Sequence, residues 1–164
     1  MNPAPAVYDA LESLGIPFQR FEHPPVFTSE EADVHWRGLP GVRCKKLFLR
    51  NKKGDHHYLV VLEISKKADL KQIVKLVNDD RLSFGSPERL MTELGLTPGS
   101  VSPFGLLNDA DGSVVVLIDE DLRGAEGLIF HPNINTASVV VSWEGLERFF
   151  KSRSNVVRYV QIRP

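Results

Sequence analysis

The sequence predicts one α+β domain over residues 1–164, built on a mixed, largely antiparallel sheet that is curved or barrel-like and is surrounded by helices. Helical and strand patterns are interspersed along the chain and include one hairpin, but they do not follow a regular βαβ rhythm. No internal repeat or linker divides the 164 residues, and a chain of this length can bury a substantial core without disulfides or structural metal.

The N-terminal part of the chain is expected to contain two helices around an extended segment. Two prolines precede the helical spacing of residues 7–14, and Gly15 marks the end of this helix. Residues 18–21 are expected to be extended. A second helix is expected to begin at Thr28, because Glu31 lies three residues further on, as in a capping box.

Residues 44–64 are expected to form a β-hairpin after a Gly/Pro turn at 38–42. The strand sequences CKKLFLRN and HHYLVVLEI are joined by a polar turn. Because side chains alternate across a strand, the first strand has two different faces. One face carries Cys44, Lys46 and Phe48, whereas Lys45 shares the other face with two leucines, Leu47 and Leu49.

The second half of the chain continues with further helices and strands. Amphipathic spacing predicts a helix over 69–77, and Ser86 followed by Pro87 predicts the start of another that ends at Gly95. An irregular loop is expected over 97–109. Strands are then expected at 113–119, 127–130, 136–142 and 156–162, with a helix over 143–151 before the last strand.

Composition limits the classes of function. Hydrophobic residues make up 42% of the chain and charged residues 25%, as in an ordinary globular domain, and the formal net charge is −1. No global positive field attracts nucleic acid, so RNA binding must rest on a local basic patch, and no DNA partner is expected. The chain shows no secretory signal and no apolar stretch of membrane-spanning length, so a cytoplasmic location without a membrane partner is expected.

Conventional catalytic and metal motifs are absent from the sequence. The five histidines lack HExxH or HxxxH spacing, so a metal site could arise only by convergence in space, and no metal or cofactor is expected. The chain has no P-loop, no GxSxG elbow and no GxGxxG after a strand. The single cysteine, Cys44, excludes an internal disulfide, and a packed thiol is the simpler interpretation of it than a reactive one.

Three segments nevertheless carry groups suited to chemistry. Lys45 lies in an apolar strand, where it could extend its ammonium past the sheet edge or hold a point charge against an oxyanion. Gly99–Pro103 is a GxxxP loop that could present several N–H groups to one oxygen, although such segments are usually ordinary turns. His131 could orient a hydroxyl or a water, with Asn133 as a second polar contact, or it could be a loop histidine bonded to the backbone.

Taken together, these segments resemble a known family. KKLFL at 45–49, LSFGSPERL from Leu82, PGSVSPFGLLND from Pro98 and FHPN from Phe130 follow the order seen in the YbaK/prolyl-tRNA-synthetase-associated editing domain family, PrdX (ProXp-ala) branch. The similarity extends over nearly the whole chain, and GSVSPFGLLND is its most specific part. The resemblance implies a barrel-like mixed sheet ringed by helices, and deacylation of mischarged tRNA, chiefly alanyl-tRNA for proline.

The resemblance also implies which residues form the site. The family's strand lysine, glycine loop and histidine match the following catalytic candidates: Lys45, His131, Gly99, Ser100, Val101, Ser102 and Pro103. The candidates for the substrate pocket are Phe48, Phe84, Phe130 and Asn133. The apolar wall that selects by size is expected from Phe48, Phe84, Val101 and Phe130. The branch often has asparagine where this chain has Lys46, so the role of position 46 is open.

Basic residues around the hairpin are the candidates for contacts with aminoacyl-tRNA. They are Arg43, Lys46, Arg50, Lys52 and Lys53, with a second group near the C-terminus at Arg148, Lys151, Arg153 and Arg158. Both groups could equally be solvated strand and helix faces. Prolyl-tRNA synthetase is a further candidate partner, as a source of tRNA selectivity.

Two other functions remain compatible with the sequence. The chain could be a non-catalytic module that binds tRNA or a synthetase, although such a module would have no evident need for both Lys45 and the GxxxP loop. It could also hydrolyse a different small acyl ester, such as a free aminoacyl nucleotide.

Overall fold

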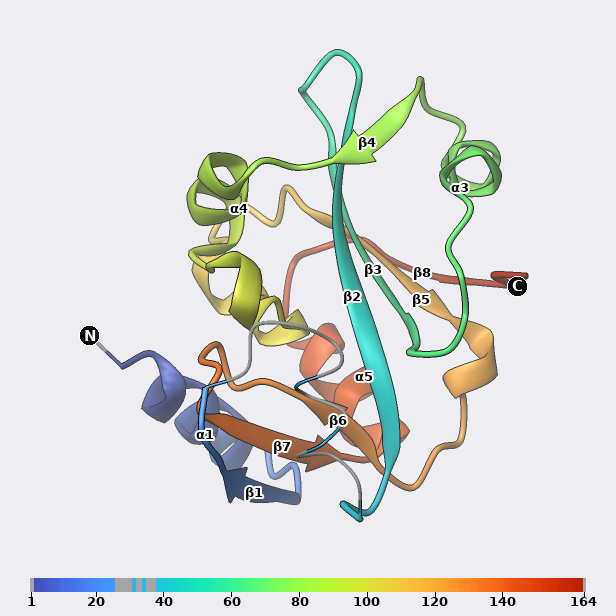
Figure 1. The fold of residues 1–164 in the computed structure, drawn as a ribbon. Coiled ribbons are helices and arrows are strands. Elements are labelled where there is room, and N and C mark those ends of the chain that lie inside the picture. The colour runs from blue at the N-terminus through green and yellow to red at the C-terminus, as the bar shows by residue number, and fades with distance from the viewer. Residues whose placement is uncertain (1, 26–30, 32–33, 35–37, 164) are drawn as a thin grey trace.

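The structure is a computed structural model that describes residues 2–25, 31, 34 and 38–163. It contains a twisted sheet with the strand order β1-β7-β6-β2-β3-β5-β8, and β4 pairs with β2 beside this path (Figure 1). The strands are β1 (Phe18–Glu22), β2 (Val42–Asn51), β3 (His57–Glu63), β4 (Leu82–Phe84), β5 (Val115–Asp119), β6 (Leu128–Phe130), β7 (Ala137–Val141) and β8 (Val157–Val160).

Helices lie on both faces of this sheet. The α-helices are α1 (Ala4–Ser13), α3 (Leu70–Val77), α4 (Pro87–Leu94) and α5 (Trp143–Lys151), and the 3-10 helices are η1 (Pro98–Ser100), η2 (Pro103–Asn108) and η3 (Glu120–Leu122). Of the seven strand pairings among the described residues, four are antiparallel and three, β2–β6, β3–β5 and β5–β8, are parallel. The α+β class and the mixed sheet are therefore confirmed.

Strand β2 connects the two halves of the sheet. Val42 and Arg43 pair with β6, and residues 49–51 pair with β4. Between these two contacts the described pairings of β2 are with β3 alone. Residues 44–48 therefore border a gap between β6 and β4, and this gap positions the site described below.

The two faces of β2 bury different cores, as the alternation of the sequence predicts. Cys44 and Phe48 belong to the larger core, which packs the sheet against α1, α4, η2 and α5. Leu47 and Leu49 face a smaller core, which α3 covers. A third small cluster, centred on Ile129 and Val140, lies on the face of β6 and β7 that points away from the larger core.

Local signals fix the helix ends where the sequence predicts them. Ser86 caps α4 by accepting a hydrogen bond from the N–H of Arg89, and Pro87 occupies the first turn. Gly95 ends the helix in the left-handed region at φ 66°, where a Cβ would lie 2.8 Å from the Asn108 side-chain nitrogen. The capping box expected at Thr28–Glu31 lies outside the described residues apart from Glu31.

Three features differ from the prediction. Strand β2 begins at Val42, within the expected turn, because its first residues pair with β6. The loop expected over 97–109 contains η1 and η2. Strand β4 was not predicted, since three residues are too few for a periodic pattern and β4 exists through its pairing with β2. In the described part of the chain, no helix is long and apolar enough to cross a lipid bilayer.

Candidate functional site

The structure brings two of the predicted segments together at the gap beside β2. The histidine loop is the segment after β6 that contains His131 and Asn133. The side-chain nitrogen of Asn133 donates to the carbonyl oxygen of Phe104 at 3.2 Å, which links this loop to the residue after the GxxxP segment. The rings of Phe104 and Phe130 also meet edge to face, with centroids 6.1 Å apart. The loop after β6 and the start of η2 thus form one buried unit.

The GxxxP segment is a folded turn whose polar groups are partly used. The N–H of Ser100 donates to the carbonyl oxygen of Thr97 at 2.9 Å, so this N–H is not available to a ligand, contrary to the hypothesis for residues 99–102. The hydroxyl oxygen of Ser102 accepts from the N–H of Phe104 at 3.0 Å and caps η2. Both serines and Pro103 are buried, whereas Val101 is half-buried. Pro103 has no N–H to offer.

The two neighbouring lysines of β2 have different environments. The ammonium of Lys46 donates to the carbonyl oxygen of Cys44 at 3.1 Å and lies 6.0 Å from the centroid of the Phe130 ring. Burial lowers the pKa of Lys46 to about 8. Lys46 is also a candidate for contacts with tRNA, and the structure places its ammonium beside Phe130 and the backbone of β2.

Lys45 projects from the opposite face of β2, with Leu47 and Leu49. It is half-buried, and it forms no hydrogen bond or ion pair with any of the described residues. The parallel register of β2 and β6 pairs Arg43 with Ile129. Lys45 follows this last pair by two residues and therefore lies at the edge of the gap, whereas the lysine whose charge acts on His131 is Lys46.

His131 is a buried, neutral imidazole. Its Nδ1 donates to the carbonyl oxygen of Ala137 at 3.2 Å, which fixes the tautomer and leaves Nε2 as the basic nitrogen. Burial and the nearby charge of Lys46 lower the pKa of His131 to about 3. His131 is therefore suited to accept a hydrogen bond from a hydroxyl or a water, and it is a weak base.

His23 is a neighbour that the sequence analysis did not select. Its ring centroid lies 6.4 Å from that of His131. Its Nδ1 donates to the carbonyl oxygen of Pro24 at 2.9 Å, so Nε2 accepts from the hydroxyl of Ser138 at 2.8 Å. One signal could have found it, because His-Pro occurs at 23–24 as well as at 131–132.

The protonation of His131 gives a direct test of its environment. We expect its ring proton resonances to stay constant in an NMR titration from pH 8 to pH 5, because its pKa lies near 3. The exposed His56, whose pKa is raised by its hydrogen bond to the carboxylate of Asp79, serves as the internal control, and its ring proton resonances should move as the ring takes up a proton. A His131 resonance that moves with a midpoint near 6.5 would show that the ring is solvated.

Asn133 has the marks of a constrained site residue. It is buried and adopts a left-handed backbone conformation with φ 64°, which is uncommon outside glycine. Its side-chain oxygen is buried and has no hydrogen-bond partner among the described residues. A buried acceptor of this kind suits a donor that arrives with a ligand.

The aromatic pocket candidates do not form one wall. Phe130 is fully buried against Phe104, and Phe48 is buried with its ring stacked on His57 at 5.5 Å between centroids. Phe84 is 63% exposed on β4, so it does not belong to an enclosed pocket. The short strand β4 leaves this side chain in solvent although its partner Leu49 is buried.

The basic candidates are divided between the gap and the far end of the hairpin. Lys52 and Lys53 are exposed at the tip of the β2–β3 hairpin, which lies at the top of Figure 1, away from β6 and β7. Acidic groups accompany them, because Lys53 pairs with Asp55 at 3.7 Å and the N–H of Lys52 donates to Asp80 at 2.7 Å. The tip is therefore of mixed charge, contrary to the expected basic patch.

The arginines of both basic groups largely bond to the backbone. Arg50 donates to the carbonyl oxygens of Asn51 and Lys52, at 3.1 Å each. In the C-terminal group, Arg148 donates to the carbonyl oxygen of Gly15 at 2.8 Å and Arg158 to that of Leu76 at 2.9 Å. Arg43 is half-buried at the start of β2, where it pairs with Ile129 of β6.

Cys44 is a packed thiol, as the simpler interpretation of the sequence predicts. Its side chain is buried in the larger core, and burial raises the pKa of its thiol to about 12. A thiol with this pKa carries almost no thiolate at neutral pH and is a poor nucleophile.

The mixed sheet carries the lysine strand, the GxxxP turn and the histidine loop around one gap. These features together define a class of protein, which comparison with known proteins identifies. The model of the aminoacyl-tRNA editing domain family matches residues 23–149, and the chain belongs to this family. It is 40% identical over 162 residues to the prolyl-tRNA editing protein ProX of Acetoanaerobium sticklandii, with 99% of each chain covered.

Other relatives agree with this assignment. The prolyl-tRNA synthetase associated domain-containing protein 1 of Bos taurus is 32% identical over 151 residues, which cover 90% of this chain and 88% of that protein. A crystal structure of a candidate trans-editing enzyme for prolyl-tRNA synthetase superposes with a TM-score of 0.75 at 23% identity, covering 100% of this chain and 98% of the other. This last likeness shows the shared fold.

Proposed function

We propose that this chain is a trans-acting aminoacyl-tRNA deacylase whose main substrate is alanyl-tRNA for proline. The observation that carries the proposal is the bond from Asn133 to Phe104, which joins the histidine loop to the GxxxP turn in a chain of the editing family. The full-length similarity to a prolyl-tRNA editing protein supports proline as the tRNA identity.

The chemistry needs positioning and charge more than a strong nucleophile, because an aminoacyl ester is already activated. Water attacks the ester carbonyl, and the bond to the ribose oxygen breaks to give alanine and free tRNA. In the proposed route the 2′-hydroxyl of the terminal adenosine organises this water. Nε2 of His131 accepts a hydrogen bond from the hydroxyl or the water, which suits a neutral ring of low pKa.

Lys45 supplies positive charge to the oxyanion in this proposal. Its ammonium has no hydrogen bond or ion pair among the described residues, so it can turn toward a ligand. The buried oxygen of Asn133 could accept from the ammonium of the alanyl group. The remaining N–H groups of the GxxxP turn hold the ester and ribose in place.

The biological use of such an enzyme follows from the limits of size selection. A synthetase site for proline cannot strongly exclude the smaller alanine, because a missing methylene is worth only about 1–3 kcal/mol. A second site that admits alanine and excludes proline corrects the error. In this chain the buried Phe130 and the half-buried Val101 remain the candidates for the limiting wall.

A panel of charged tRNAs tests the proposal. We expect the protein to deacylate alanyl-tRNA for proline faster than cysteinyl- or seryl-tRNA, and to leave prolyl-tRNA intact. The measurement is the loss of labelled amino acid from each tRNA against a control without protein. Binding of tRNA with no loss of label from any substrate would instead support a non-catalytic module. Equal cleavage of a free alanyl-adenosine would support the hydrolase of small acyl esters.

A further inference from the structure

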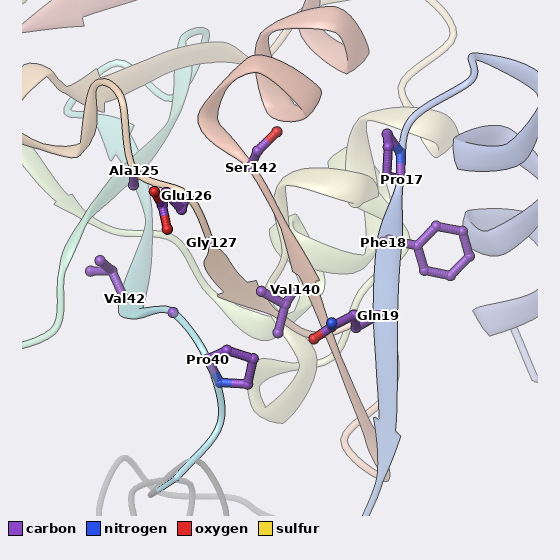
Figure 2. Close-up of a pocket in the computed structure, with 11 residues that line it drawn as sticks. Pro17, Phe18, Gln19, Pro40, Val42, Ala125, Glu126, Gly127, Val140 and Ser142 are labelled. Atoms are coloured by element: carbon purple, nitrogen blue, oxygen red, sulfur yellow. The ribbon is translucent and has the colours of Figure 1, made fainter.

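The outer face of β1, β7 and β6 carries a cavity that is separate from the site described above. It has a volume of about 750 Å³ and lies where the starts of β1, β2 and β6 meet the end of β7. Figure 2 shows the amide of Gln19 directed toward Val140, whereas the ring of Phe18 points to the other side of β1. Pro40 and Val42 border the cavity from the start of β2.

This cavity continues the face on which the histidines lie. Gln19 pairs with Val140, and both side chains are on the same side of the sheet as Ser138, which bonds His23. Ser138 and Val140 are two positions apart on β7, which is about 7 Å along a strand. The last pair of residues between β6 and β7 is Phe130 with Val139, and His131 and Ser138 are the next residues along the two chains. His23 links them, because it bonds Ser138 and its ring lies 6.4 Å from that of His131.

The lining of the cavity has the chemistry of a site for a flat, amine-bearing ring. Seven of its 11 lining residues are valine, proline, alanine or glycine, and none of the 11 is basic. Its side-chain polar groups are the Gln19 amide, the Glu126 carboxylate and the Ser142 hydroxyl. Such a lining disfavours a phosphate and favours a neutral ligand with hydrogen-bond donors.

The two main polar groups are available to a ligand. Gln19 and Glu126 are exposed, and neither side chain forms a hydrogen bond or an ion pair with the described residues. A glutamine amide can bond both the exocyclic amine and the ring nitrogen of adenine, and a carboxylate accepts from the amine of cytosine. The cavity volume also lies within the range of sites for small ligands.

We propose that this cavity holds an amine-bearing nucleobase from the 3′-terminal single strand of the tRNA, while the aminoacyl ester lies at His131. This inference rests on the proposed function. Gln19 and Glu126 read the exocyclic amine, and Pro40, Val42 and Val140 contact the ring. The base is either the terminal adenine or the cytosine before it, since both carry an exocyclic amine.

Steady-state deacylation of alanyl-tRNA tests the subsite. The double variant Gln19→Ala/Glu126→Gln should raise KM about tenfold and leave kcat within twofold, because the base contacts are remote from the ester. Hydrolysis of alanine ethyl ester, which has no base, should be unchanged. The control is Asp111→Asn, an exposed acid outside the cavity, which should match the parent. An unchanged KM for the double variant on alanyl-tRNA would refute the subsite.

Altered substrates identify the base. In one tRNA the terminal adenosine is replaced by inosine, and in another the preceding cytidine is replaced by uridine. The replacement at the base that the cavity binds should raise the KM of the parent protein. With that same tRNA, the double variant should show no further increase in KM. If neither replacement changes KM, the proposal is wrong.

Direct binding separates the subsite from catalysis. A fluorescent RNA tetramer ending in CCA should bind the parent more tightly than the double variant at low salt. If the parent deacylates alanyl-tRNA but both proteins bind the tetramer equally, the enzyme stands and the subsite fails. If no substrate is deacylated but the variant binds the tetramer about tenfold more weakly, the subsite stands and the proposed function fails.

Discussion

Replacing Lys45 with alanine should lower the rate of alanyl-tRNA deacylation about a hundredfold, which is the scale of losing one oxyanion contact. The physical reason is the free charge of Lys45 at the edge of the gap. Its ammonium forms no hydrogen bond or ion pair with the described residues, and Lys45 follows the last β2–β6 pair by two residues, at the edge of the gap. Single-turnover kinetics with saturating protein measure the chemical step directly.

The neighbouring lysine provides the matched comparison. Lys46→Ala should reduce the same rate less than tenfold, because the Lys46 ammonium is already bonded to the Cys44 carbonyl and its pKa is near 8. Lys71→Ala, in an exposed part of α3, should have no effect. A hundredfold loss in Lys46→Ala with an active Lys45→Ala would transfer the oxyanion role to Lys46.

Most of the fold could be predicted from local patterns. Helices α3, α4 and α5 begin directly after Asp69, Ser86 and Ser142, whose side chains cap them, and these residue types are strong local signals. The alternation of β2 correctly separated Cys44 from Leu47, because the two residues belong to different cores. Parallel pairings were harder to predict, since β3–β5 and β5–β8 join segments that are distant in the sequence.

The candidate site was only partly predictable for the same reason. The motifs located the GxxxP turn and the histidine loop, but nothing local indicates that Asn133 bonds Phe104 or that Lys46 lies beside Phe130. The prediction that Phe84 lines the pocket was wrong, because a phenylalanine in an apolar pattern is usually buried. Here the side chain is exposed on β4, which has only three residues. His23 meets His131 only through the pairing of β1 with β7.

Lys66 forms an ion pair with the buried Asp119, which is distant from it in the sequence. Its replacement has the largest expected effect on stability. The ammonium of Lys66 lies 2.6 Å from the Asp119 carboxylate and 2.5 Å from that of Asp121, and it donates to the carbonyl oxygen of Ile162 at 2.8 Å. Asp119 is fully buried. One side chain thus joins the end of β3 to the end of β5 and to the segment after β8.

Replacing Lys66 with methionine should lower the free energy of unfolding by about 3–5 kcal/mol, because it leaves the Asp119 carboxylate buried without its counter-ion. Urea denaturation followed by circular dichroism measures this change. Lys53→Ala is the control, because it removes the ion pair between Lys53 and Asp55, in which the Lys53 side chain is 77% exposed. It should change the free energy of unfolding by about 0–1 kcal/mol.

A second variant separates the charge from the packing. Lys66→Met combined with Asp119→Leu removes both buried charges, so it should recover part of the loss seen in Lys66→Met alone. If Lys66→Met is as stable as Lys53→Ala, water or a movement of the chain stabilises the Asp119 carboxylate in place of the Lys66 ammonium. In that case the three strand ends are not held together by this lysine. If the double variant is less stable than Lys66→Met by more than about 1 kcal/mol, the carboxylate itself contributes through its remaining bond to the N–H of Asp121.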